Sequence, residues 1–213
     1  MMGTFPQGIY ISEDDGATWT ESNVGWTRDG CFRLVSHPRD PDHVFAGTYN
    51  GINQSRDFGK IWERSDQGWP PEQWVFSIDF SPQDPEIMVA CSKNGENEGR
   101  GRDDFRGTVM RSDDGGDSWY HITNGLNPEQ EFYEILFDKN DPEVVYLAAQ
   151  QQGVMISVDG GMSWENWNDG LDGALPATNG NNVTRCLVLS SDGESLIFGT
   201  NGSGVYQRKR YQR

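Results

Sequence analysis

Four stretches of the chain repeat one pattern, Ser-x-Asp-x-Gly-x-x-Trp, and this pattern decides the fold. The first two are Ser12-Glu-Asp14-Asp-Gly16-Ala-Thr18-Trp19 and Ser55-Arg-Asp57-Phe-Gly59-Lys-Ile61-Trp62. The other two are Ser112-Asp-Asp114-Gly-Gly116-Asp-Ser118-Trp119 and Ser157-Val-Asp159-Gly-Gly161-Met-Ser163-Trp164. Their first residues lie 43, 57 and 45 positions apart. A pattern that recurs at this spacing indicates a repeat architecture, in which each repeat is one supersecondary unit.

The residue types of the pattern predict a tight hairpin that ends in a packed aromatic ring. An Asp side chain in a turn accepts hydrogen bonds from backbone N–H groups that follow it. Glycine allows the positive φ that a tight hairpin needs, and a Ser or Thr hydroxyl bonds across the same loop. The Trp then begins the next strand and buries a large ring between neighbouring sheets. We therefore expect a structural role for these Asp residues, and neither a catalytic nor a metal-binding one.

A second module precedes each hairpin, and it consists of two alternating runs joined by a turn. Residues 32–48 alternate between apolar and polar types, turn at Asp40-Pro41 and alternate again. The same order recurs at 76–91, 133–149 and, with Asp-Gly in place of Asp-Pro, at 185–200. Alternation with period two predicts strands, and helical periodicity is absent. Four strands in roughly 40–50 residues is the size of one β-propeller blade.

The sequence thus predicts an all-β chain, a β-propeller of four-stranded antiparallel blades with about four to five blades. The expected blade portions are residues 1–24, 31–66, 75–123, 132–168 and 184–207, followed by a basic tail at 208–213.

The hairpin pattern and the Asp-Pro-x-x-Val-Tyr strand resemble those of the Asp-box (BNR) repeat propellers. That group includes sialidases, xyloglucan-degrading glycosidases, sortilin-type receptors and photosystem II assembly factors. The resemblance covers essentially the whole chain, and it implies Asp-box hairpins on a propeller scaffold. It implies no single activity, because one fold hosts unrelated functions.

The two ends of the sequence leave open whether the blades form a closed ring. Residues 3–10 match the late second and the third strand of other units, and residues 204–207 match a third strand with no hairpin after it. Either the terminal strands meet in a small closed ring, or the ring is incomplete and is completed by further blades or by self-association. We favour the incomplete ring, in which the unpaired edges of the terminal strands must be covered to avoid aggregation.

The charge of the chain excludes several classes of partner. The net charge is −16, which argues against nucleic acid, whose binding rests on Lys and Arg at phosphates. Anionic membranes are disfavoured for the same reason, and no 18-residue apolar run predicts membrane insertion. We expect the basic cluster Arg208-Lys-Arg210 with Arg213 to form a frayed, solvated tail.

Cysteine and histidine usage predicts no metal and no cofactor. The three cysteines lack metal-like spacing, and the three histidines are scattered. No signal peptide follows Met1. The compartment therefore stays open: extracellular or periplasmic if an upstream signal is missing, and cytoplasmic otherwise.

A ligand-binding face is expected on the side opposite the Asp-box hairpins. There, loops between blades and between the second and third strands bring aromatic and polar residues together. This mixture suits a glycan or a protein partner. The candidates are Trp26, Arg28, Tyr49, Trp74, Arg100, Arg102, Tyr133 and Arg185. An alternative for each Trp is that its ring fills the space between blades.

A glycoside hydrolase needs two carboxyl groups about 5 to 9.5 Å apart, one on each side of the glycosidic bond that it cleaves. Asp29, Glu72 and Glu131 are weak catalytic candidates on the expected face. No spacing singles out a pair, and the Arg-Ile-Pro motif of sialidases is absent. The leading hypothesis is therefore a non-catalytic propeller, or part of one, that binds a protein or glycan. The alternative is a glycoside hydrolase of the xyloglucanase or sialidase type, or a fragment of one, that uses paired carboxylates.

Overall fold

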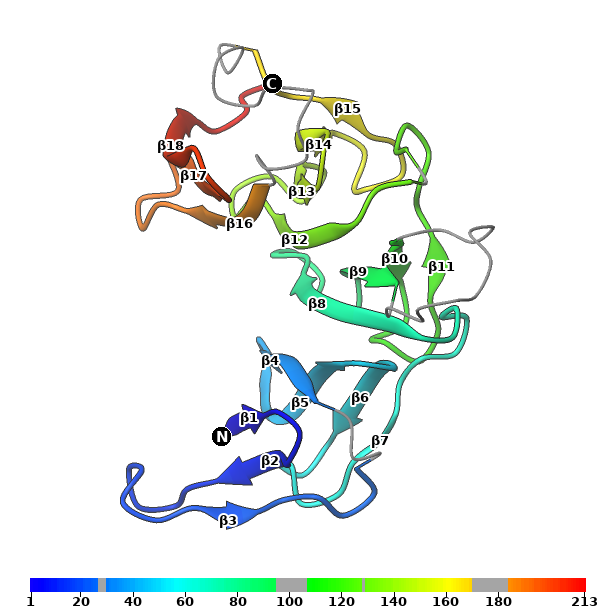
Figure 1. Cartoon of the computed structure of the whole chain (residues 1–213), viewed down its shortest axis with the longest axis vertical. Coiled ribbons are helices and arrows are strands. Elements are labelled where there is room, and N and C mark those ends of the chain that lie inside the picture. The colour runs from blue at the N-terminus through cyan, green and yellow to red at the C-terminus, as the bar shows by residue number, and fades with distance from the viewer. Residues whose placement is uncertain (27–29, 95–106, 128, 170–183) are drawn as a thin grey trace.

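The computed structural model describes residues 1–26, 30–94, 107–127, 129–169 and 184–213. In these residues the chain forms five antiparallel sheets and no helix. The sheets, numbered 1 to 5 in chain order, follow one another around an open arc (Figure 1). Sheets 2, 3 and 4 have four strands each, and sheets 1 and 5 have three. The prediction of an all-β propeller built from four-stranded sheets is confirmed, and the arc fits an incomplete ring.

Each four-stranded sheet is a meander whose first strand lies toward the concave side of the arc (Figure 1). The first strand of each of sheets 2 to 5 is called the inner strand below. Sheet 1 comprises β1 (Met2–Thr4), β2 (Gly8–Ile11) and β3 (Thr20–Glu21), and sheet 2 comprises β4 (Cys31–His37), β5 (Asp40–Thr48), β6 (Gly51–Ser55) and β7 (Glu63–Arg64). Sheet 3 comprises β8 (Gln73–Phe80), β9 (Met88–Asn94), β10 (Val109–Ser112) and β11 (Tyr120–His121). Sheet 4 comprises β12 (Phe132–Phe137), β13 (Val145–Ala149), β14 (Gly153–Ser157) and β15 (Glu165–Asn166). Sheet 5 comprises β16 (Thr184–Leu189), β17 (Ser195–Thr200) and β18 (Gly204–Lys209).

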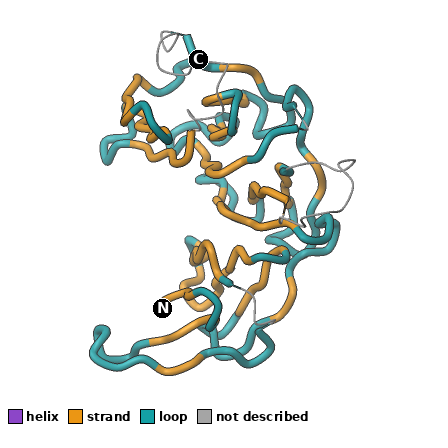
Figure 2. The backbone as a smooth tube through the Cα atoms, in the orientation of Figure 1, coloured by secondary structure: helices purple, strands orange, loops and turns teal. Residues whose placement is uncertain are grey.

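Long connections run between the last strand of one sheet and the first strand of the next. The connection from β7 to β8, for example, passes along the outer rim and returns to the concave side (Figure 2). The core is divided accordingly into separate apolar layers, each shared by two neighbouring sheets. The layer between sheets 3 and 4, for example, holds Val89 and Cys91 against Ile135, Leu147 and Trp164. Burial of such apolar surface is the main stabilising contribution to the contact between sheets.

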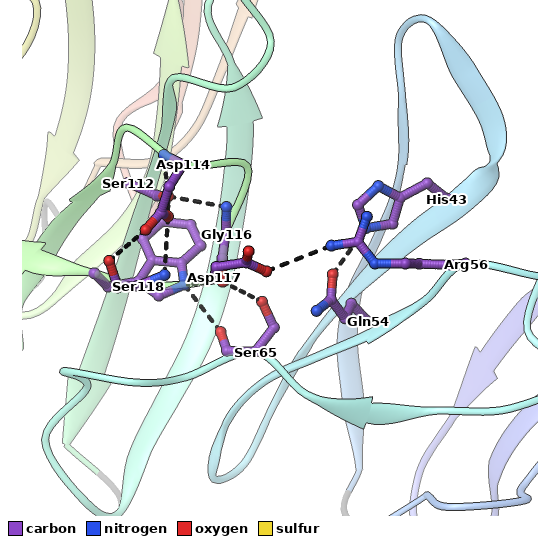
Figure 3. Close-up of polar contacts among 10 residues, drawn as sticks. His43, Gln54, Arg56, Ser65, Ser112, Asp114, Gly116, Asp117 and Ser118 are labelled. Carbon is purple, nitrogen blue, oxygen red and sulfur yellow. Dashed lines mark hydrogen bonds and ion pairs between the residues drawn. The ribbon is translucent and has the colours of Figure 1, made fainter.

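The four Ser-x-Asp-x-Gly hairpins share one hydrogen-bond pattern. In the third, the Gly116 N–H donates to Ser112 Oγ at 2.9 Å, and Ser112 Oγ donates to Asp114 Oδ1 at 2.7 Å (Figure 3). The Ser118 N–H and hydroxyl donate to the two carboxylate oxygens of Asp114, at 2.9 and 2.5 Å. In the first hairpin the Thr18 hydroxyl and N–H lower the pKa of Asp14 to about 2. The aspartates therefore close the turns, as their residue types require.

In three of the four hairpins, the Trp at the end of the hairpin binds the sheet before it. Trp62, Trp119 and Trp164 are 2–5% exposed. The indole N–H of each donates to a backbone carbonyl at 2.8–2.9 Å, and the backbone N–H donates to a second carbonyl at 2.8–2.9 Å. The indole acceptors are Ser22 for Trp62, Ser65 for Trp119 and Ile122 for Trp164.

A glycine makes this close approach possible. A Cβ at Gly25, Gly68 or Gly125 would lie 2.1 Å from the carbonyl oxygen of the docking Trp, and all three have positive φ. In sheet 1 the corresponding Trp19 is 41% exposed, and its indole bonds to Gly16 of its own hairpin. In the described residues the Trp contact is therefore an intersheet contact, made by Trp62, Trp119 and Trp164.

The C-terminal basic segment contradicts the expected frayed tail. Arg208 Nη1 donates to the carbonyl of Trp167 at 2.6 Å, and its guanidinium lies 3.5 Å from the Trp167 ring centroid. Arg210 pairs with the buried Asp138 at 3.6 Å, and the Tyr211 N–H donates to the Tyr146 hydroxyl at 3.0 Å. The expectation was wrong because it counted the charges of the segment and not the carbonyl and carboxylate acceptors that sheet 4 offers.

Arg208 takes the place that a docking Trp has elsewhere. Trp167 occupies in sheet 4 the position of Ser22, Ser65 and Ile122, because each of these four residues donates its N–H to the strand next to the last strand of its own sheet, namely β14, β2, β6 and β10. Their carbonyls accept the indole N–H of Trp in sheets 2 to 4, and the carbonyl of Trp167 accepts the guanidinium of Arg208. Sheet 5 is thus held by the same acceptor through a different donor.

Substitution of Trp119 by Phe tests the intersheet contact. The variant loses the indole bond to Ser65 and leaves unfilled space, so the free energy of unfolding should fall by about 2 kcal/mol or more. Trp19→Phe is the matched control and should change it by less than about 0.5 kcal/mol, since Trp19 is partly exposed. Urea unfolding followed by circular dichroism measures both, and equal losses would contradict the assignment.

Candidate functional site

The inner strands of sheets 2 to 5 each contain a β-bulge at the same place. The pairing register shifts between Cys31 and Arg33, and it shifts at the equivalent point of β8, β12 and β16. A bulge leaves one residue outside the ladder and re-aims its side chain, and bulges are frequent beside functional sites. The four bulged residues are Phe32, Phe76, Tyr133 and Arg185.

The four bulged side chains form a continuous row across the inner strands, called the bulge row below. The Phe32 and Phe76 ring centroids are 4.8 Å apart, and those of Phe76 and Tyr133 are 5.7 Å apart. The Arg185 guanidinium lies 4.0 Å from the Tyr133 ring centroid. Edge-to-face and offset contacts of this kind stabilise aromatic pairs, and a cation over the ring face adds to them. The row therefore has an aromatic body and a cationic end.

Loop aromatics extend the bulge row at its aromatic end. The Tyr49 ring, on the loop between β5 and β6, lies 4.6 Å from Phe32 and 4.4 Å from Trp74. Phe5, which is 66% exposed, lies 5.1 Å from Tyr49. Tyr49 and Trp74 are half-buried. These three loop and strand-end side chains are called the rim aromatics.

A polar row lies one residue further along the same inner strands. Arg33 Nη2 is 3.3 Å from Glu134 Oε1, and the Ser77 hydroxyl donates to the same oxygen at 2.9 Å. This contact reaches from sheet 2 to sheet 4 across the inner strand of sheet 3. Burial raises the pKa of Glu134, and the neighbouring Arg33 opposes that shift.

Asp79 is a second perturbed carboxyl group on the inner strand of sheet 3. Burial raises its pKa to about 6, although the Phe137 N–H donates to Asp79 Oδ2 at 2.8 Å and favours the charged form. The inner strands thus carry two carboxyl groups that are harder to ionise than in water. Perturbed carboxyl groups of this kind often mark functional sites, and structural networks produce them as well.

The sequence-predicted carboxylates lie in different settings. The Tyr133 hydroxyl donates a hydrogen bond to Glu131 Oε2 at 2.5 Å. Burial is the larger cause, and this hydrogen bond the smaller one, of a raised pKa of Tyr133. Glu72 is exposed in the connection between β7 and β8, with φ of 59°. Its N–H donates to Asn50 at 3.4 Å. The structure therefore places Glu131 beside the bulge row and Glu72 on a separate loop, while Asp29 lies outside the described residues.

Four of the eight predicted ligand-face residues meet in one connected set. Tyr49, Trp74, Tyr133 and Arg185 belong to the bulge row or the rim aromatics, although Tyr133 is only 7% exposed. Trp26 does not: it is 6% exposed, and its ring lies 5.2 Å from Trp62 at 77° between sheets 1 and 2. The assignment of Trp26 to the ligand face is corrected, because its ring fills the space between sheets. Arg28, Arg100 and Arg102 lie outside the described residues.

Sequence reasoning missed Phe5, Phe32, Phe76 and the polar row. A signal was available in the inner strands, which read Cys31-Phe-Arg-Leu34, Val75-Phe-Ser-Ile78 and Phe132-Tyr-Glu-Ile135. An aromatic residue directly after an inward-facing one breaks the period-two alternation, and a recurring break at one position indicates a bulge.

The structure adds two negative findings for the residues it describes. No three His, Cys, Asp or Glu side chains gather there in a way that would hold a metal ion. The same residues contain no helix with the length and apolar character to span a membrane.

Replacement of Asp79 by Asn tests the buried carboxyl group. The folded-state pKa lies above the unfolded value, so Asp79 contributes stability that is fully present below about pH 4 and lost as pH rises through about 6. Asn keeps an oxygen acceptor for the Phe137 N–H and carries no charge. The free energy of unfolding of Asp79→Asn should therefore exceed that of the unmodified protein by an amount that grows from near zero at pH 4 to about 2–3 kcal/mol at pH 8.

Asp114→Asn is the matched control, with the opposite sign. Burial raises the pKa of Asp114, but hydrogen bonds from Ser118 and Ser112 outweigh it, so the net pKa is lowered. This variant should therefore be more destabilising at pH 7 than at pH 3. Urea unfolding across pH gives both curves, and a pH-independent difference for Asp79→Asn would refute the buried-charge assignment.

Comparisons with known proteins agree with the fold. No family model matches the chain. A xyloglucanase of a Paenibacillus species is 25% identical over an alignment that covers 93% of this chain and 22% of that protein. The photosystem II assembly lipoprotein Ycf48 of Synechococcus sp. (strain CC9605) is 27% identical over 208 residues, which cover 92% of this chain and 51% of that protein. The chain therefore spans between about a fifth and a half of these relatives.

Solved structures show the same architecture. An ancestral GH74 enzyme superimposes with a TM-score of 0.76 at 22% identity, over 98% of this chain and 28% of that one. The GH74 xyloglucanase of Xanthomonas campestris gives 0.68 at 16% identity, over 97% and 34%. Ycf48 of Cyanidioschyzon merolae gives 0.51 at 16% identity, over 85% and 56%. The sheets, their order and these likenesses together identify the chain as a β-propeller protein whose described sheets form part of a ring.

Proposed function

We propose that this chain is an Asp-box propeller, or part of one, that binds a glycan without turning it over. The ligand surface is formed by Phe32, Phe76 and Arg185 of the bulge row together with the rim aromatics Phe5, Tyr49 and Trp74. Tyr133, which is 7% exposed, supports Phe76 and Arg185 from the buried side of the row. The observation that supports this most is the unbroken series of ring contacts from Phe5 to Tyr133, with centroid separations of 4.4–5.8 Å. Three equivalent bulges hold Phe32, Phe76 and Tyr133 on the inner strands, and a fourth holds Arg185.

The chemistry of the surface suits a sugar chain. Aromatic rings offer flat apolar faces to the C–H faces of sugars, and a few fixed polar groups orient the ligand. Such groups are the Arg185 guanidinium at the cationic end of the row, the Glu131 carboxylate that bonds to Tyr133, and the side chain of Asn50, which follows Tyr49. The rings are already held in place by one another, so binding costs little side-chain ordering. The likeness to xyloglucanases supports a glycan as the first ligand class to examine.

The Asp-box assignment belongs to this proposal. It is supported by four hairpins in which a Ser hydroxyl accepts the Gly N–H at 2.7–2.9 Å. In each hairpin the Asp carboxylate also accepts the N–H four residues on, at 2.8–2.9 Å.

Xyloglucan binding measured by affinity gel electrophoresis tests the proposal. Trp74→Ala removes the ring that contacts Phe32 and Tyr49, and it should weaken the retardation at least tenfold. Tyr120→Ala is the control, because Tyr120 is an exposed aromatic on β11 that bonds Asp113 outside the row. Circular dichroism must show the folded state in both variants. No retardation of the unmodified protein by xyloglucan or by a panel of other neutral and acidic polysaccharides would refute the proposal.

A glycoside hydrolase is the second candidate, favoured by the Tyr133–Glu131 hydrogen bond beside Arg185. Under this reading Glu131 and a second carboxylate, with Glu72 and Asp29 as candidates, would flank the bond to be cleaved. A reducing-end assay on xyloglucan decides between the two. Product formation that Glu131→Gln or Glu72→Gln abolishes would establish the enzyme, whereas binding without product supports the non-catalytic propeller.

A protein partner is the remaining alternative for the same surface. The likeness to Ycf48, a photosystem II assembly lipoprotein by name, motivates it. Loss of binding to a protein client in Trp74→Ala, with no glycan bound by the unmodified chain, would favour that partner class.

A further inference from the structure

Two of the three histidines of the chain stack on each other at the boundary between sheets 2 and 3. The ring centroids of His37 on β4 and His43 on β5 are 5.6 Å apart, with 24° between the ring planes. The Phe80 ring of β8 meets His37 nearly at right angles, with centroids 5.5 Å apart. The Phe45 ring lies 4.4 Å from His43 and 5.8 Å from Phe80. The imidazole pair is therefore part of the aromatic packing that joins sheet 2 to sheet 3.

His43 occupies a position that is aliphatic in the next two sheets. Counted from the Asp-Pro turn of each sheet, its equivalents are Ile87 in sheet 3 and Val144 in sheet 4. Both pack in the apolar layers between sheets. His43 is buried as well, with 6% of its surface exposed. Sheet 2 thus holds a titratable ring at a buried position where its neighbours hold a hydrocarbon side chain.

The polar surroundings of His43 are specific to sheet 2 in the same way. Its Nε2 atom lies 2.8 Å from Oε1 of Gln54 on β6. The equivalent residue of sheet 4, directly before the hairpin serine, is Ile156. Arg56 lies near the His43 ring and reaches Asp117 of the third hairpin at 3.4 Å (Figure 3). A polar contact between sheets 2 and 3 therefore passes beside the imidazole pair.

The environment of His43 favours its neutral form. Burial is the main cause that lowers the pKa of His43. Two neighbours oppose this shift and two add to it: Gln54 and Asp40 oppose it, and Arg56 and His37 add to it. In an open boundary the imidazole would have its ordinary pKa of about 6.5. Because the pKa in the closed boundary is lower, the contribution of His43 to closure is fully present above about pH 6.5. It is lost as pH falls from there through the lowered pKa.

We propose that the His37–His43 pair makes the contact between sheets 2 and 3 pH-sensitive, closed at neutral pH and loosened in mildly acidic surroundings. Two protonated imidazoles at this separation would repel each other, and a charge on His43 would lie within buried aromatic packing. The side chain that β8 presents to the pair is the uncharged Phe80 ring. Asp79 of the same strand does not balance the charge, because it accepts the N–H of Phe137 in sheet 4.

The same two inner strands carry part of the bulge row. Strand β4 holds Phe32 near its start and His37 at its end, and β8 holds Phe76 and Phe80 in the same order. A boundary that loosens at the histidine end would therefore weaken the contact between Phe32 and Phe76 as well. Under the proposed function, acid would then release the ligand. That consequence rests on the proposed function, whereas the pH-sensitive contact does not.

Backbone amides of two docking tryptophans report on two different boundaries. The Trp119 N–H donates to Gln67 across the boundary of sheets 2 and 3, and the Trp62 N–H donates to Val24 across the boundary of sheets 1 and 2, both at 2.8 Å. Amide hydrogen exchange followed by NMR gives their protection factors, which are corrected for the intrinsic effect of pH. From about pH 7.5 to 5 the protection factor of Trp119 should fall about fivefold or more, and that of Trp62 by less than about twofold.

A triple variant removes the titrating pair and keeps the packing. His37→Ser, His43→Val and Gln54→Ile together give sheet 2 the residues that stand at these positions in sheets 3 and 4. In this variant the protection factor of Trp119 should change by less than about twofold over the same pH range. His121→Gln is the matched control, because His121 is exposed on β11 and lies two residues after Trp119. It should leave the fall at Trp119 unchanged.

Three outcomes would overturn the proposal. The first is a protection factor of Trp119 that does not fall in acid, and the second is an equal fall at Trp62, which would indicate general unfolding. The third is a fall that persists in the triple variant. If that variant does not fold, an NMR titration of the unmodified protein decides: a His43 ring that titrates at about 6.5 or above would refute the proposal. These measurements use no glycan, so their failure is distinguishable from failure of the proposed function.

Discussion

Everything in this arc depends on how one sheet is fixed to the next, and a buried Trp does this at three successive boundaries. The ring supplies apolar area, its indole N–H bonds to a carbonyl of the preceding sheet, and its backbone N–H bonds to another. A glycine at the contact removes the Cβ that would collide with the Trp carbonyl. Because apolar packing alone is non-directional, these hydrogen bonds set the angle between sheets, and the inner strands then converge on one concave face.

That convergence creates the candidate site. Each inner strand carries the same one-residue bulge, so side chains that strict alternation would direct elsewhere meet their neighbours across the sheets. One residue further on, Arg33, Ser77 and Glu134 form a polar contact that joins three sheets. The surface is thus rigid in two ways, through aromatic contacts and through a partly buried ion pair.

The sequence predicted what depends on local chemistry. Hairpin closure needs only residues within one turn, so Asp14 and its counterparts were recognisable, and period-two alternation located most strands. Contacts between repeats were harder. Trp26 looked available but is covered by Trp62, and Arg208 looked solvated but binds the Trp167 carbonyl. Phe32 and Phe76 were missed because a bulge depends on pairing register, which a single strand does not reveal. Residues 27–29 and 95–106, which hold several candidates, lie outside the described part of the chain.

Sheet 5 shows that closing a hairpin and attaching a sheet are separable tasks. Elsewhere one motif performs both, since Ser, Asp and Gly shape the turn while Trp reaches the neighbour. Arg208 reaches the equivalent carbonyl from strand β18 itself, and it belongs to no Ser-x-Asp-x-Gly hairpin. A repeat can therefore lose its recognisable signature and keep its place in the array, provided that some donor satisfies that carbonyl. In proteins of this kind the number of recognisable hairpin motifs is then a lower bound on the number of blades. The backbone carbonyls that accept such a donor mark where a blade without the motif attaches.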